Sequence, residues 1–162
     1  MDSKVLEQLY RKYHRELYLY IYAICKNKSL SEDLLQETFL KAILALPDGH
    51  TNMRAWLYLV ARNLTYNALK KAEHSPEVLA KALAVKTDEG PLDTLLQKEQ
   101  YRSLYENLQK LSRRAREILI LQYFAKLSHK EIAQVLAMSP QAVRMAAVRA
   151  RKELKTYMEE EL

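Results

Sequence analysis

The side chains best suited to molecular recognition lie near the C-terminus, on a segment that begins at Ser139. Gln141 and Arg144 can form hydrogen bonds with the edges of bases in a DNA groove. Three cationic side chains farther along the segment are suited to phosphate oxygens, which fix the register of a protein on DNA. The predicted DNA-binding set is therefore Ser139, Gln141, Arg144, Met145, Arg149, Arg151 and Lys152.

A DNA-reading segment of this kind needs another helix to pack against, and the residues just before it are predicted to form that helix. Ser128 and Glu131 have the spacing of a capping box, which starts a short helix. Ala137 falls in the turn, where a left-handed backbone costs a residue with a Cβ about 1 kcal/mol. Ser139 can cap the next helix, from which Val143 points inward. A basic, solvated helix in a plain hairpin is the alternative, but spacing, caps and charge together favour a DNA-reading helix-turn-helix.

The composition indicates an all-α protein. The 162 residues include only 2 Gly and 4 Pro, which is too few for Gly-rich nucleotide loops or a many-turned β sandwich. The formal net charge of +6 favours a polyanionic partner.

Residues that could support catalysis or hold a metal are sparse. The 4 histidines are scattered, and no two of them have the helical spacing of metal ligands. The single cysteine, Cys25, excludes a disulfide framework and fits a cytoplasmic protein. The first residues lack the apolar core of a signal peptide, and no apolar run approaches a membrane span. We therefore expect no enzymatic activity, no cofactor, no metal and no direct insertion into a membrane.

Apolar residues at spacings of three and four predict three helices in the first half of the chain. The first covers 4–26, and its stripe places Tyr10, Tyr13 and Tyr20 in a core. The second is expected to start with a capping box at Ser29 and to stop at Pro47. Asn52 can cap the third, which runs through about Lys71. The expected buried face of this third helix consists of Ala55, Trp56, Leu59, Val60 and Leu64.

Prolines, glycine and acidic residues concentrate between positions 75 and 97, where acidic residues outnumber basic ones. Such a composition is typical of a linker, and the segments on both sides are basic. The sequence thus predicts two small helical domains, 1–74 and 98–162, which are joined by an acidic linker over 75–97.

Three runs resemble the signatures of one family, the bacterial sigma factors of the extracytoplasmic-function group. Residues 31–42 and 54–63 look like family region 2, and 111–154 is similar to region 4. The resemblance covers nearly the whole chain and implies a promoter-specificity subunit of RNA polymerase. It also implies three partners: core RNA polymerase, promoter DNA that is duplex at −35 and melted at −10, and an anti-sigma factor. A stand-alone helix-turn-helix regulator is the alternative, against which the run 31–42 argues.

The resemblance further implies two binding sites in the first domain. Asp33, Gln36 and Glu37 would dock on the coiled coil of the largest polymerase subunit, while Phe39 packs in the core. The loop 47–52 and the helix after it would hold and read the melted −10 element, with Trp56 in the core rather than acting as a stacking wedge. The −10 set implied in this way is Asn52, Arg54, Arg62, Asn63, Asn67, Lys70 and Lys71.

Overall fold

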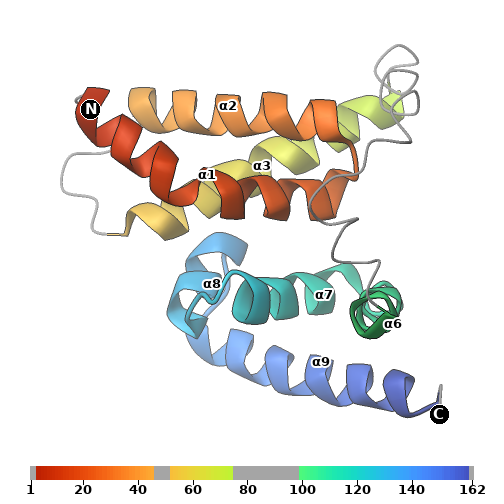
Figure 1. Cartoon of the computed structure of the whole chain (residues 1–162). Coiled ribbons are helices and arrows are strands. Elements are labelled where there is room, and N and C mark those ends of the chain that lie inside the picture. The colour runs from red at the N-terminus through yellow and green to blue at the C-terminus, as the bar shows by residue number, and fades with distance from the viewer. Residues whose placement is uncertain (1–2, 46–51, 75–98, 161–162) are drawn as a thin grey trace. The chain divides into compact units, whose positions relative to one another are not determined.

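The computed structural model describes residues 3–45, 52–74 and 99–160, and within these ranges the chain is helical without a strand. The described residues belong to two compact units, each of which has its own helices (Figure 1). This arrangement confirms the expected all-α fold with two small helical domains. The expected linker, 75–97, and the loop residues 46–51 lie outside the described residues.

The first unit is a bundle of three helices, α1 (Ser3–Cys25), α2 (Lys28–Ala45) and α3 (Met53–His74), each of which contacts the other two. The helices contribute stripes of apolar side chains to one shared core. Tyr20 and Tyr58 are almost completely buried, and their rings meet edge to face with centroids 5.1 Å apart. The other main core residues are Leu17, Ile21, Leu34, Leu35, Phe39, Leu57, Ala61 and Leu64.

Two details of the first two helices differ from the expectation. Tyr10 is 40% exposed rather than in the core, because it lies on the bundle surface, where it stacks on His14 and meets the edge of Phe39. The cap of α2 is Asn27 rather than Ser29, since the Asn27 carboxamide oxygen accepts a hydrogen bond from the Leu30 amide at 2.9 Å. The helix therefore begins two residues earlier than the capping-box pattern predicts.

The third helix has the expected cap but a shifted buried face. The Asn52 carboxamide oxygen accepts a hydrogen bond from the Ala55 amide at 3.0 Å, which confirms the cap. Trp56 and Leu59 are only half-buried, so the expectation that they belong to the core is not met. Leu57 and Tyr58 are completely buried instead, because the side of α3 that faces α1 and α2 is centred on them and on Ala61.

The second unit consists of α6 (Glu99–Leu108), α7 (Arg113–Leu119), a π-helical turn η1 (Ile120–Phe124), α8 (His129–Leu136) and the long helix α9 (Pro140–Glu160). Helix α9 contacts α6, α7 and α8 (Figure 1). Ser112 caps α7, with its hydroxyl oxygen 3.2 Å from the Ala115 amide. The completely or almost completely buried apolar side chains include Ile118, Leu121, Ile132, Val135, Val143, Ala147 and Ala150.

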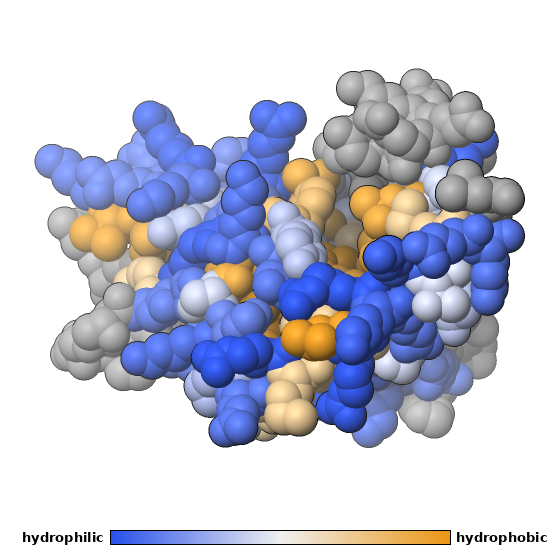
Figure 2. All heavy atoms as spheres, turned by 90° about the horizontal axis from the view of Figure 1, so that it is seen from below, coloured by the Kyte–Doolittle hydropathy of each residue, from blue (hydrophilic) through white to orange (hydrophobic). Residues whose placement is uncertain are grey.

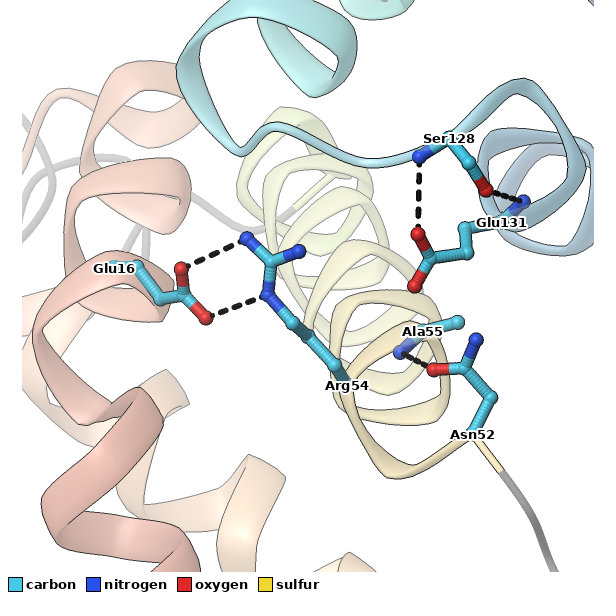
Figure 3. A network of polar contacts seen from close by, with 6 residues as sticks. All are labelled: Glu16, Asn52, Arg54, Ala55, Ser128 and Glu131. Carbon is cyan, nitrogen blue, oxygen red and sulfur yellow. Dashed lines mark hydrogen bonds and ion pairs between the residues drawn. The ribbon is translucent and has the colours of Figure 1, made fainter.

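The helix-turn-helix is formed by α8 and the first turns of α9, and its local features agree with the prediction. Glu131 donates its amide hydrogen to the Ser128 hydroxyl oxygen at 3.1 Å, and its carboxylate accepts one from the Ser128 amide at 3.0 Å (Figure 3). Ala137 has φ 55° and ψ 49°, the left-handed conformation expected in the turn. Ser139 then caps α9 by accepting a hydrogen bond from the Ala142 amide at 3.1 Å.

The left-handed backbone at Ala137 predicts that glycine stabilises the second unit. Ala137→Gly relieves the clash of the Cβ with the backbone, although glycine also raises the entropy of the unfolded chain. We expect a net gain of about 0.5–1 kcal/mol, measured as slower hydrogen exchange of the α8 and α9 amides in the full chain. The matched control is Ala146→Gly in the interior of α9, which should cost about 1 kcal/mol. Destabilisation by both variants would contradict the prediction.

Candidate nucleic-acid and polymerase interfaces

The outer side of α9 presents the side chains that were predicted to read DNA. Gln141, Arg144 and Met145 lie within one turn, and all three are exposed, Met145 by 56%. The opposite side of the helix carries Val143 and Ala147, which are completely buried. Hydrophilic side chains predominate on the face of the molecule drawn in Figure 2, and the apolar ones form small separate groups. The start of α9 is thus exposed on one side and packed into the unit on the other.

Two members of the same set have additional contacts within the unit. The Ser139 hydroxyl oxygen accepts the capping hydrogen bond, which leaves its own hydrogen as a donor. A guanidinium nitrogen of Arg151 donates a hydrogen bond to the Tyr123 hydroxyl at 3.2 Å. Arg149 and Lys152 are exposed on the outer side of α9. Sequence reasoning missed Tyr123, because it lies 28 residues before its arginine partner.

The second candidate surface is the exposed side of α3. Asn63 and Asn67 are exposed one turn apart, so their carboxamides share a side of the helix. Lys70 continues this side, and the neighbouring Lys71 is also exposed. The guanidinium carbon of Arg62 lies 5.0 Å from the centroid of the Tyr66 ring.

The start of α3 is fixed by polar contacts. The Arg54 guanidinium forms a two-bonded ion pair with the Glu16 carboxylate of α1, with both N···O distances 3.0 Å (Figure 3). Arg54 also lies over the ring of Tyr58, at 5.8 Å from its centroid. Burial, and then the charge of Glu16, raise the pKa of Tyr58, so this phenol stays neutral. Sequence reasoning missed this pair, because Glu16 lies 38 residues away.

The third candidate surface runs along α2. Asp33, Gln36 and Glu37 are exposed on one side, and Leu40 and Leu44 continue that side with exposures of 54% and 78%. The opposite side packs into the bundle core, and Phe39 is only 5% exposed, which confirms its expected place in the core. The two leucines could have been found from the sequence, because they follow Glu37 at helical spacing.

The described part of the chain gives little support for metal binding, for a reactive cysteine or for a membrane-spanning helix. It contains no group of three or more His, Cys, Asp or Glu residues that could hold a metal ion. Burial raises the pKa of the Cys25 thiol, which lies 3.2 Å from the Ser31 hydroxyl, so the reactive thiolate is disfavoured. None of the described helices combines the length and apolar character that a membrane crossing requires.

Comparison with known proteins finds a family match for each of the two units. Residues 9–90 match the family described as sigma-70 region 2, and residues 101–154 match sigma-70 region 4. Among curated proteins, RNA polymerase sigma factor YlaC of Bacillus subtilis is 34% identical, with 94% of this chain and 91% of the relative covered. The ECF RNA polymerase sigma factor SigM of the same organism is 30% identical, with 93% of each chain covered.

The solved structures support the same fold. The sigma factor RpoE in complex with the anti-sigma factor NepR, from Bartonella quintana, superposes with a TM-score of 0.70 at 22% identity, over 96% of this chain and 98% of that one. The two family regions occur in order and between them span most of the sequence. This chain therefore belongs to the extracytoplasmic-function group of the sigma-70 family of bacterial RNA polymerase sigma factors.

Proposed function

We propose that this promoter-specificity subunit of RNA polymerase uses the outer side of α9 to read the −35 element as duplex DNA. The observation that carries this assignment is a complete helix-turn-helix whose second helix exposes Gln141, Arg144 and Met145 at its start. In this assignment Gln141 and Arg144 bond base edges, and Met145 makes apolar contacts in the groove. Arg149 and Lys152 bind phosphates, and Ser139 contributes through its helix cap. Arg151 reaches a phosphate while held by Tyr123.

The exposed side of α3 is proposed to bind the melted −10 element. Asn63 and Asn67 offer both donors and acceptors to the edge of an unpaired base. Arg62, Lys70 and Lys71 bind the backbone of the strand. The contacts of Asn52 and Arg54 favour a different role for these two residues, since both hold the start of α3 in place. We therefore assign them to positioning rather than to direct contact with phosphate.

The exposed side of α2 is the proposed docking surface for core polymerase. Asp33, Gln36 and Glu37 form its polar half, which suits a basic partner surface, and Leu40 and Leu44 form an apolar half. An anti-sigma factor is proposed as a further partner, which is supported by the RpoE–NepR complex. Sigma factors are regulatory subunits without catalytic activity. We extend this to the present chain, and we place its action in the cytoplasm with core polymerase.

The division of the chain is proposed to follow the sequence prediction. The first domain, 1–74, would carry polymerase docking and −10 recognition, and the second, 98–162, would carry −35 recognition. The acidic segment 75–97 would join them. Each domain then holds the described helices of one compact unit, while the first unit, 1–92, and the match to region 2, 9–90, both extend into the acidic segment.

Transcription in vitro tests the proposed function. The purified chain is added to core polymerase with fragmented genomic DNA, and the 5′ ends of the transcripts are sequenced. We expect initiation at a set of sites that share two short elements, and no initiation with core alone. A chain that binds DNA unaided, is not retained by core polymerase in a pull-down and starts no transcripts would instead be a stand-alone regulator.

A further inference from the structure

Tyr66 is an aromatic residue on the side of α3 that the proposed function assigns to melted DNA. It lies three residues after Asn63, so these two side chains are neighbours on the helix surface, and it directly precedes Asn67 in the sequence. Its side chain is half-buried, whereas the core residues of α3, such as Leu57 and Ala61, are completely buried. The ring is therefore not a member of the bundle core.

The Tyr66 ring is held in place by its neighbour one turn earlier. The guanidinium carbon of Arg62 lies 5.0 Å from the ring centroid, a distance typical of a cation–π contact. A guanidinium is planar, weakly hydrated and always charged, so it can pair with an aromatic face and still meet a phosphate or a base. The two flat side chains are thus already in contact in the free protein.

Planar surfaces of this kind recognise unpaired nucleotides. Bases that have left the duplex stack on aromatic rings and on arginine planes, and this stacking tolerates any sequence because every base has a π face. Hydrogen bonds from nearby amides then supply the sequence preference. Asn63 and Asn67 are suitably close to do this, and Lys70 adds positive charge on the same side.

We propose that Arg62 and Tyr66 form a stacking platform for one unpaired base of the −10 element, beside the amides of Asn63 and Asn67. The proposal rests on the assignment of α3 to melted DNA and adds a residue that the sequence did not single out. Stacking would favour the melted strand over the duplex, because only an unpaired base can reach the platform. Tyr66 would thus contribute to promoter opening without itself choosing the sequence.

The test uses the complete chain bound to core polymerase. The probe is a single-stranded oligonucleotide that covers the non-template −10 element of a promoter transcribed in vitro, with 2-aminopurine at successive positions. Tyr66→Phe keeps the ring and should bind within about twofold of the unmodified chain. Tyr66→Leu keeps an apolar side chain without the ring, and it should bind about 5- to 150-fold more weakly, the range for loss of one base–aromatic stack. Arg62→Lys keeps the charge without the plane and should show an intermediate loss.

Two further measurements separate stacking from a loss of structure or charge. In the unmodified complex, 2-aminopurine fluorescence should be quenched at one position, and Tyr66→Leu should remove that quenching. The salt dependence of binding should stay the same in Tyr66→Leu, whereas Arg62→Ala should lower its slope by about 0.7 if the guanidinium also meets a phosphate. Circular dichroism of each variant reports whether the helices are intact.

Each outcome distinguishes the platform from the function on which it rests. Loss of binding in Asn63→Ala and Asn67→Ala with unchanged binding in Tyr66→Leu would overturn the platform and keep α3 as the −10 surface. Unchanged binding in all of these variants would overturn the assignment of α3 itself. Equal losses in Tyr66→Phe and Tyr66→Leu would also overturn the platform, because they would show that the hydroxyl rather than the ring is needed.

Discussion

Reversal of two charges on α2, Asp33→Lys together with Glu37→Lys, is expected to weaken binding of core polymerase at least about tenfold, because like charges placed across an interface cost several kcal/mol. Both carboxylates are exposed on one side of the helix, so their replacement leaves the bundle core untouched. Titration of fluorescently labelled protein with core polymerase measures the change. The loss should be larger at low salt than at high salt.

The control for this prediction has the same change in net charge at another place. Glu7→Lys with Glu106→Lys alters two exposed carboxylates on α1 and α6, outside the proposed docking surface, and should leave core binding nearly unchanged. If both double variants weakened core binding equally, only total charge would matter. That result would contradict the assignment of α2 as the docking surface.

The apolar half of the same surface is expected to contribute to the affinity for core polymerase. Charge reversal does not measure this contribution. Leu40→Ala and Leu44→Ala truncate side chains that are 54% and 78% exposed, so neither should cost the free protein much stability. If the leucines are covered by core polymerase, each truncation should weaken binding, because apolar area is then lost from the interface. The effect of these variants should persist at high salt, in contrast to that of the lysine variants.

The features that could be predicted from the sequence are those that depend on neighbouring residues. The Ser128–Glu131 capping box, the left-handed turn at Ala137 and the Ser139 cap are all determined within a few residues of each other, and the structure confirms each. Local hydrogen bonds and backbone preferences are sufficient to specify such a motif. The helix-turn-helix was therefore the most accurately predicted part of the chain.

Features that depend on distant residues were not predicted. The Glu16–Arg54 pair joins α1 to α3, so a residue for which the resemblance implied a DNA contact also holds two helices together. Tyr10 was expected in the core, but helical spacing does not show where a stripe runs out of the bundle. Trp56 lies at the margin of the buried face of α3, whereas Ala55, Val60 and Leu64 are buried as expected. All three depend on how the helices pack, which periodicity alone does not determine.

The second prediction concerns α9, where Arg144→Ala is expected to cost about 1–3 kcal/mol in binding to the duplex −35 element if the guanidinium bonds a base edge. The loss should be confined to promoters with the preferred base at one position, so preference at that position should relax. Arg149→Ala and Lys152→Ala should instead weaken binding to all sequences alike and lower the salt slope by about one unit each. Binding of the chain with core polymerase to a panel of single-base promoter variants, at several salt concentrations, measures both effects.

The three residues lie on one exposed side of one helix, so the comparison between them is internally controlled. None of them packs in the core, and all three replacements remove one positive charge and introduce the best helix former. Differences between the variants must therefore come from what each side chain contacts on DNA. A uniform loss for all three would make Arg144 a phosphate contact and would leave Gln141 and Met145 to read the bases. Sequence-dependent loss in Arg149→Ala would instead mean that the reading surface extends a further turn along α9.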